Sequence, residues 1–222
     1  MRLIASLVLL ALLAPLPALL MAGGAAPAGE ALRASLSVAL PAALVSTLLG
    51  TAAGIGLQAR FPGRGLALAL IALPLLLPPV ILGAALLLAA ERNGPAGLLV
   101  PMLSHVLLGA PLVTAIIWMA LRRIDAALFR AAAACGVPPT LAARRIVGPR
   151  LWPAMLLGAV LSFGLSMGES TLAVMLGAGT LPVAVLSGAG SVTAVLWLLA
   201  VMVLGLLLVF PPLQPRGEVP PA

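Results

Sequence analysis

The sequence has few of the residues that keep a soluble protein in water. Charged residues make up 8% of its 222 residues, and neither lysine nor tyrosine occurs. A soluble globular domain carries roughly 25% charged residues, so the composition excludes that class. It also excludes intrinsic disorder, which requires low hydrophobicity together with high charge. The single cysteine, Cys135, rules out a disulfide bond within the chain.

Several kinds of functional site lack the residues they would need. The one histidine, His105, is not part of a Cys, His and acid cluster with metal-ligand spacing, so we expect no metal site and no cofactor. A Walker A nucleotide site requires lysine, which the chain does not have. The net charge of +7 comes from arginines between apolar runs, with only three Trp and four Phe for stacking. We therefore expect no nucleic-acid binding.

Long apolar runs dominate the chain instead. Hydrophobic residues make up 63% of the sequence, and six runs are long enough to cross about 30 Å of hydrocarbon. These runs lie at about 3–21, 36–57, 66–90, 98–121, 153–176 and 192–210. A backbone in lipid must satisfy its own hydrogen bonds, and the alternating pattern of a β-barrel is missing. We therefore expect an all-α polytopic membrane protein with about six transmembrane helices.

The arginines predict the orientation of these helices, because cytoplasmic loops carry an excess of positive residues. With the N-terminus in the cytoplasm, only Arg33 and Arg92 of the twelve arginines lie outside. Both termini are then cytoplasmic, including a Pro-rich tail at 211–222. Residues 1–28 leave a cleaved signal peptide as an alternative, although the length of the apolar run favours a retained helix.

One predicted cytoplasmic loop differs from the short connections elsewhere. Residues 122–152 form the longest polar stretch and hold six of the twelve arginines. The pattern predicts two short helices, at 125–135 and 140–147, separated by a Gly-Val-Pro-Pro break and ended by Gly148-Pro149. Thr140 is expected to cap the second helix. A structured loop of this kind favours contact with a partner, and a solvated basic loop that only fixes topology is the alternative.

This loop resembles the signature of binding-protein-dependent ABC transporter permeases. The family pattern is Glu-Ala-Ala, three residues, Gly, nine residues, Ile, one residue, Leu-Pro. The positions that match it are Ala131, Ala132, Gly136, Ile146 and Pro149. Two positions differ, because Arg130 stands at the Glu position and Gly148 at the Leu position.

Other segments resemble the same family, so the resemblance covers residues 33–210 of a single transmembrane domain at 1–222. These segments are 60–65, 77–80, 105–125, 161–167 and 180–182. Within the family, the chain looks like the second permease of spermidine/putrescine-type importers. That group also serves ferric iron, thiamine and phosphonate systems.

The resemblance implies a type I ABC importer permease of a bacterial inner membrane. Such a chain forms half of the translocation pathway together with a second permease, which is either the same or a related chain. Cytoplasmic ATP-binding cassette ATPase subunits hydrolyse ATP, so the chain itself is not an enzyme. An extracytoplasmic substrate-binding protein delivers a small solute such as polyamine, thiamine, ferric iron or phosphonate. The motif residues, from Arg130 to Pro149, would contact the ATPase.

Three side chains within the predicted spans have alternative interpretations. Glu169 is the only acid inside a predicted span, where a charge costs about 2.5–3.5 kcal/mol, so it either lines the pathway or is a structural acid. His105 is expected to be a hydrogen-bonded packing residue. Ser166 lies in a Gly-x-Ser-x-Gly pattern typical of a nucleophile elbow. Gly164 and Gly168, like Gly50 and Gly54, more simply predict a helix-packing face.

Two further functions are weighed against the importer hypothesis. An intramembrane serine protease would use Ser166 as its nucleophile and His105 as its base. An ATP-independent carrier or channel would not need the loop at 122–152 to bind an ATPase. A carrier typically has more ionisable residues within the membrane than this sequence offers.

Overall fold

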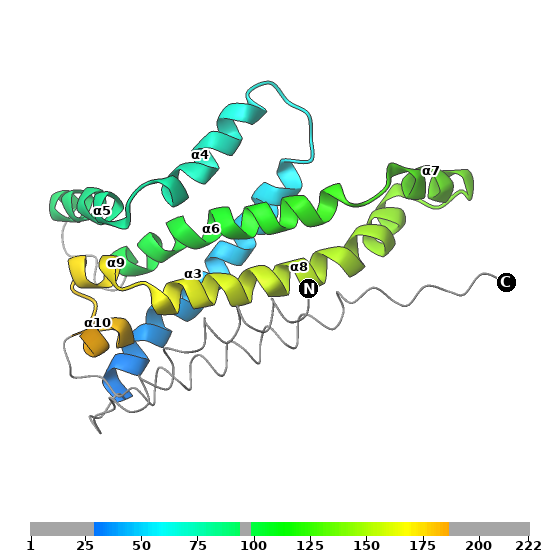
Figure 1. Ribbon diagram of the computed structural model, residues 1–222. Coiled ribbons are helices and arrows are strands. Elements are labelled where there is room, and N and C mark those ends of the chain that lie inside the picture. Colours follow the sequence, from blue (N-terminus) through cyan, green and yellow to red (C-terminus); the bar gives the residue numbers. More distant parts are fainter. Residues whose placement is uncertain (1–28, 94–98, 187–222) are drawn as a thin grey trace, which may run out of the picture.

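The computed structural model describes residues 29–93 and 99–186, and these residues form helices joined by short connections (Figure 1). The helices are α3 (Gly29–Gly56), α4 (Arg64–Leu76), α5 (Pro79–Asn93), α6 (Leu99–Arg122), α7 (Ala126–Ala134), α8 (Pro139–Gly168), α9 (Thr171–Met175) and α10 (Leu181–Leu186). The spans predicted at 3–21 and 192–210, and the tail at 211–222, lie outside the described residues.

Helices α3, α6 and α8 are each long and apolar enough to cross a membrane. Helices α4 and α5 form a fourth candidate span only as a bent pair, with an angle of 98° between them. An all-α, multi-pass membrane protein is thereby confirmed, together with the helices predicted at 36–57 and 98–121.

The prediction of one continuous helix at 66–90 is wrong, because the chain breaks between α4 and α5. Leu77 is extended, with φ −77° and ψ 135°, and two prolines follow it. A proline has no N–H to donate, and it disfavours the helical conformation of the residue before it. The Pro78-Pro79 pair therefore ends α4 and lets α5 leave in a new direction.

The core lies where α3, α6 and α8 pack against one another. A Cβ added at Gly50 would lie 2.6 Å from the Val113 Cβ, and one at Gly54 would lie 2.8 Å from the Ile117 Cβ. Val113 and Ile117 of α6 are fully buried in these contacts. The glycines of α3 therefore allow the two backbones to approach closely, as the spacing of Gly50 and Gly54 predicts.

The same prediction is wrong for Gly168, because a Cβ added there would meet no neighbour within 4 Å. The glycine of α8 that does sit in the core is Gly158, where a Cβ would lie 3.1 Å from Val113 Cγ1. Val113 is thus held between a glycine of α3 and a glycine of α8.

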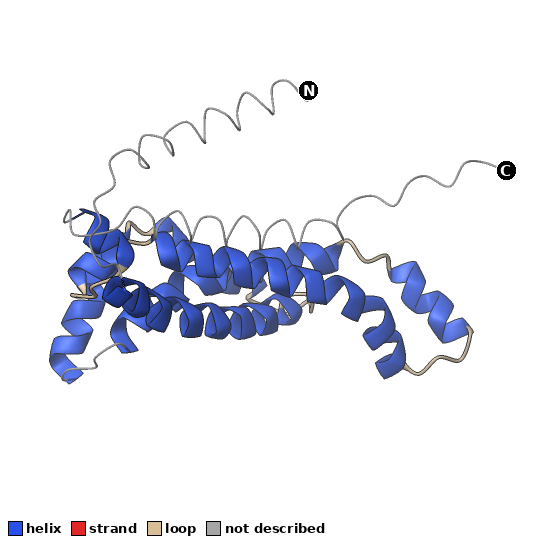
Figure 2. Cartoon of the chain, turned by 90° about the horizontal axis from the view of Figure 1, so that it is seen from below, coloured by secondary structure: helices blue, strands red, loops and turns tan. Residues whose placement is uncertain are grey.

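Helix α7 and the first turns of α8 form a hairpin that extends beyond the other helices. Figure 1 places this hairpin at the end of the molecule opposite α9 and α10. Seen from below, the hairpin bends away from the long helices (Figure 2). It contains the family-like loop, so the fold presents the candidate coupling segment at one end.

Candidate functional site

The hairpin begins with a capped helix. Asp125 is extended, and its Oδ1 accepts a hydrogen bond of 2.8 Å from the Ala127 N–H at the start of α7. A carboxylate at this position satisfies a backbone donor that has no partner within the helix and interacts favourably with the helix dipole. The Ala-rich sequence then continues the helix to Ala134, as predicted.

Gly136 ends α7 in a left-handed conformation, with φ +69°. The Gly136 N–H donates to the Ala133 carbonyl at 3.0 Å, and the Val137 N–H donates to the Ala132 carbonyl at 3.0 Å. This pair of bonds is a Schellman motif, which favours glycine at the left-handed position because a Cβ would be strained there. The glycine of the motif therefore sets the turn of the hairpin.

Two local predictions for the second half of the hairpin are wrong. Helix α8 begins at Pro139, so Thr140 lies within it and does not cap it. A proline in the first turn is tolerated because its missing N–H would have no partner there. Helix α8 also continues through Gly148-Pro149 to Gly168, whereas the sequence predicts an end at this dipeptide.

Packing explains why α8 continues through Pro149. An interior proline costs about 3 kcal/mol, because it removes a backbone hydrogen bond and crowds the preceding turn. Val147 and Leu151 flank Pro149 and pack against a buried cluster that includes Ile117 and Ala154. Both side chains are half-buried, and their van der Waals contacts with this cluster offset part of the penalty.

The motif residues differ in their exposure. Arg130, Ala131, Gly136 and Pro149 are exposed, whereas Ala132 and Ile146 are half-buried. The structure therefore places all six on the hairpin or at the point where α8 joins the bundle.

The hairpin also exposes apolar side chains next to its arginines. Leu128 is 44% exposed, Phe129 is 37% exposed and Leu141 is 38% exposed. Arg130 directly follows Phe129, and its side chain is also exposed. These exposed apolar side chains are available for contact with a partner.

Glu169 lies at a helix end and not inside a span. Helix α8 ends at Gly168, and Glu169 follows as its extended C-cap residue. Its side chain is half-buried, and Oε1 accepts a hydrogen bond of 3.0 Å from the Leu172 N–H in the first turn of α9. The prediction that Glu169 sits within a continuous helix at 153–176 is therefore wrong.

His105 makes the packing hydrogen bond that the sequence predicts. Its Nδ1 lies 2.5 Å from the Ser166 hydroxyl, and both side chains are buried. The pair joins α6 to α8. The structure thus brings together the two residues that the protease hypothesis requires, but within helices and not on a strand-turn-helix.

Two contacts outside the hairpin were not predicted from the sequence. Ser35 of α3 accepts a hydrogen bond of 2.7 Å from the Leu181 N–H, a contact between residues 146 positions apart that no local pattern reveals. Trp118 of α6 has the guanidinium groups of Arg64 and Arg122 at 5.7 and 4.9 Å from its ring centroid. The spacing of Trp118 and Arg122 by four residues along a helix was a signal for the second contact.

Comparison with known proteins identifies the family, although no family model matches the chain. The molybdenum transport system permease protein ModB of Haemophilus influenzae is 34% identical over 155 residues, which cover 63% of this chain and 68% of the relative. A probable molybdenum ABC transporter permease protein of Haloferax volcanii is 31% identical over 196 residues, covering 78% of this chain and 72% of the relative.

A third relative is a permease named for a polyamine. The putrescine transport system permease protein PotI of Escherichia coli is 34% identical over 160 residues, which cover 67% of this chain and 57% of the relative. The chain thus spans little more than half of that protein. These relatives are transport components and not enzymes, which sets the protease hypothesis aside. The chain belongs to the family of ABC transporter permeases, as the loop at 122–152 suggests.

Proposed function

We propose that the chain is the transmembrane permease subunit of an ATP-driven importer and that its α7–α8 hairpin binds the ATPase. The observation that carries this proposal is the surface of the hairpin. Exposed Leu128 and Phe129 lie beside exposed Arg130 on a segment that extends beyond the long helices. A soluble partner with an apolar groove and acidic rim would bury the apolar side chains and pair with the arginine.

The geometry of the hairpin suits the transmission of movement. Helix α8 is continuous from the hairpin into the bundle, so a displacement of its first turns is passed to residues that line the core. Rigid elements of this kind carry coupling between distant sites. ATP-driven closure of the ATPase would then move α8 against α3 and α6.

Helix α8 also supports a role for a second permease subunit. Within the described part of the chain, 28% of its most apolar window is buried, compared with 50% for α3 and 56% for α6. We infer that the free face of α8 lies along the translocation pathway, opposite a second copy or a related chain. An extracytoplasmic binding protein would dock at the end that carries α9 and α10.

The positions of the arginines support a proposed orientation of the chain in the membrane. The hairpin holds Arg130, Arg144 and Arg145 at the end of the molecule where α6 also terminates in Arg122. The positive-inside rule supports a cytoplasmic location for this end, and an even number of spans would make both termini cytoplasmic as well. The inner membrane of a bacterial cell is the compartment implied by the family resemblance.

The substrate is proposed to be a small solute, and the names of the relatives specify different ones. They specify molybdenum in some systems and the cation putrescine in others. Polyamine, thiamine, ferric iron and phosphonate are the substrates implied by the sequence resemblance. Glu169 is the proposed pathway residue, and its carboxylate favours a cation.

The coupling role is tested by replacing Gly136 with tryptophan. Gly136→Trp is expected to abolish uptake and the retention of the ATPase during purification, because it strains the left-handed turn and adds bulk to the contact surface. Membrane insertion should be unchanged. Uptake and co-purification of a Walker-motif ATPase, identified by mass spectrometry, are the two measurements.

Gly177 supplies a matched control. It also has a left-handed φ of +68°, and a Cβ there would meet no neighbour within 4 Å, but it follows α9 at the opposite end of the molecule. Gly177→Trp should therefore leave retention of the ATPase intact. Normal ATPase retention by Gly136→Trp, or equal loss in both variants, would overturn the coupling assignment.

A further inference from the structure

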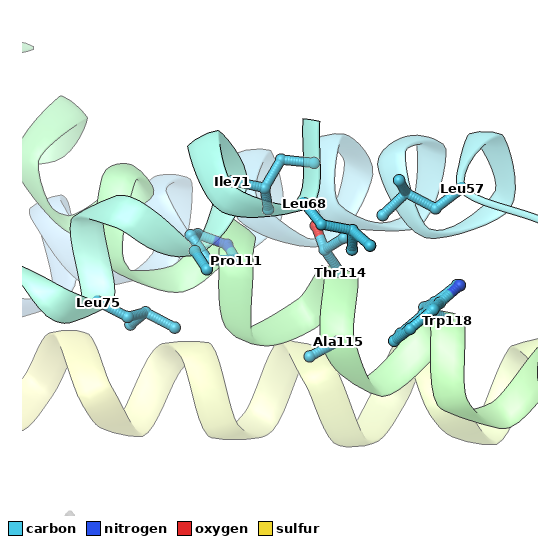
Figure 3. Close-up of a pocket in the computed structure, with 9 residues that line it drawn as sticks. Leu57, Leu68, Ile71, Leu75, Pro111, Thr114, Ala115 and Trp118 are labelled. Carbon is cyan, nitrogen blue, oxygen red and sulfur yellow. The ribbon is translucent and has the colours of Figure 1, made fainter. Parts of the chain in front are cut away.

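A small apolar cavity lies at the corner where α4 meets α6 near the end of α3 (Figure 3). Its volume is about 150 Å³. Aliphatic side chains such as Leu57 and Leu75 line it, and the hydroxyl of Thr114 donates within its own helix to the Ala110 carbonyl at 2.7 Å. The cavity is open on one side, so an apolar group such as part of a hydrocarbon chain can enter it from the surrounding membrane.

Trp118 lies at one end of the cavity, and Leu75 lies at the other (Figure 3). The guanidinium groups of Arg64 and Arg122 both lie within 6 Å of the Trp118 ring centroid, at 5.7 and 4.9 Å. The end of the cavity is therefore aromatic and strongly positive. It also lies near the ends of the helices, as is typical of tryptophan at a membrane interface.

This corner has hydrogen-bond donors without acceptors. The Nε of Arg64 and the Nε1 of Trp118 are buried, and neither has a hydrogen-bond partner among the described residues. The Gln58 amide does not supply the missing acceptor: its Nε2 donates to the Gly54 and Trp118 carbonyls, at 3.2 Å each, and its Oε1 accepts from neither Arg64 Nε nor Trp118 Nε1. Buried donors of this kind are costly unless an acceptor binds them.

No carboxylate in the described part of the chain neutralises the two arginines. Asp125 is the acid at this end of the bundle, and it caps α7 through Ala127. Glu30 begins α3 and Glu169 follows α8, so both lie toward the opposite ends of those helices. Two cations are thus held on one ring, where an anion would relieve their mutual repulsion.

We propose that an anionic phospholipid binds at this corner, with part of an acyl chain in the cavity and its phosphate on Arg64 and Arg122. Charge complementarity supports the phosphate, and the apolar cavity beside it supports a lipid over a free anion. The outward face of α4 is equally apolar, since Leu66 is 65% exposed and Leu70 is 59% exposed.

The proposed lipid would fasten α4 to the bundle. Helix α4 has no buried residue of its own, so its own side chains fasten it to the bundle only weakly. An acyl chain between α4 and α6 would add apolar contacts, and the phosphate would hold Arg64 of α4 and Arg122 of α6 at the same point. This inference does not depend on which ATPase or substrate the chain serves.

Tryptophan fluorescence tests the proposal on the full chain. The chain has three tryptophans, and the double substitution Trp152→Phe and Trp197→Phe leaves Trp118 alone. This chain is placed in phosphatidylcholine vesicles that contain increasing fractions of bromine-labelled phosphatidylglycerol or bromine-labelled phosphatidylcholine. Bromine on the acyl chain quenches a tryptophan that it contacts. Half-maximal quenching is expected at an about tenfold lower fraction of phosphatidylglycerol.

Charge variants locate the site. Arg64→Gln combined with Arg122→Gln should remove the preference for phosphatidylglycerol. Arg123→Gln is the matched control, because Arg123 is the next residue, is exposed and makes no contact with the Trp118 ring in the structure. This control should retain the preference. Loss of the preference in both variants would indicate a diffuse charge effect and would overturn the assignment.

Three further outcomes would also overturn the proposal. The first is equal quenching by the two lipids in the chain with both arginines, a comparison that needs no arginine variant to fold. The second is removal of the preference by millimolar inorganic phosphate, which would assign the site to a free anion. The third is protection of Trp118 from quenching by bromine-labelled lipid only when ATPase subunits are added. This result would assign the arginines to a protein partner.

Discussion

The bundle of α3, α6 and α8 buries large apolar side chains between its helices, whereas the hairpin of α7 and the start of α8 exposes such side chains. In the bundle, glycines admit fully buried aliphatic side chains such as Val113, so the helices pack closely against one another. In the hairpin, one cap and one glycine turn fix the backbone, while Leu128 and Phe129 stay exposed. The close contacts between α3 and α6 lie within the chain, whereas the proposed function of the hairpin requires a surface that another chain supplies.

The largest loss of stability is expected from Gly54→Leu in the bundle. A Cβ at this position would already lie 2.8 Å from the Ile117 Cβ, and the remaining leucine atoms have no space. Overpacking of this kind costs about 3 kcal/mol or more, so the purified chain in detergent should unfold at a clearly lower temperature.

Gly56→Leu is the control for this substitution, because it lies on the same helix and a Cβ there would meet no neighbour within 4 Å. It tests whether the effect comes from packing or from the loss of glycine. Similar unfolding temperatures for the two variants would contradict close packing of α3 on α6.

A smaller loss of stability is expected from Ser166→Ala. The substitution removes the hydrogen bond between α6 and α8 and leaves the buried His105 Nδ1 without a partner, at a cost of roughly 1–3 kcal/mol. Thermal unfolding in detergent measures the loss. Ser37→Ala is the comparison, because the exposed Ser37 hydroxyl donates only to the Ala34 carbonyl of its own helix. Equal stability of the two variants would show that the pair does not hold the bundle together.

In the hairpin, replacing exposed apolar side chains is expected to change binding of the ATPase with little change in stability. The double substitution Leu128→Ser and Phe129→Ser replaces exposed side chains, so the unfolding free energy should change by no more than about 0.5 kcal/mol. Retention of the ATPase during purification should fall about tenfold, because anchoring apolar contacts are lost. A destabilised chain, or one that retains the ATPase fully, would contradict the contrast between the two regions.

The parts of the fold that the sequence predicts well are those decided by hydrophobic length. The helices at 36–57 and 98–121 follow from uninterrupted apolar runs, which have no alternative in lipid. The turn of the hairpin is also predicted from local sequence, because Gly136 favours a left-handed conformation. The hairpin itself is confirmed as two helices around that turn.

The errors arise where local chemistry and packing compete. At Pro78-Pro79 local chemistry decides the outcome, and the apolar run at 66–90 is two helices despite its sufficient length. At Gly148-Pro149 packing decides it, because Val147 and Leu151 are held against the core. Both places contain residues that disfavour a helix, Pro-Pro in one and Gly-Pro in the other. Whether the helix breaks or continues depends on packing against side chains of other helices, such as Ile117 of α6.

Glu169 gives the smallest expected change in stability and the sharpest distinction between a structural and a transport role. Glu169→Gln keeps an oxygen that can accept the hydrogen bond from the Leu172 N–H, so α9 should stay capped and stability should change by less than about 0.5 kcal/mol. The substitution removes only the negative charge.

If Glu169 faces the pathway of a cationic substrate, uptake at limiting concentration should fall severalfold, because the attraction between opposite charges is lost. Glu169→Ala, which removes the acceptor as well, separates the two roles. Unchanged uptake with Glu169→Gln and a loss of stability with Glu169→Ala would make the carboxylate a cap for α9 and exclude it from the pathway.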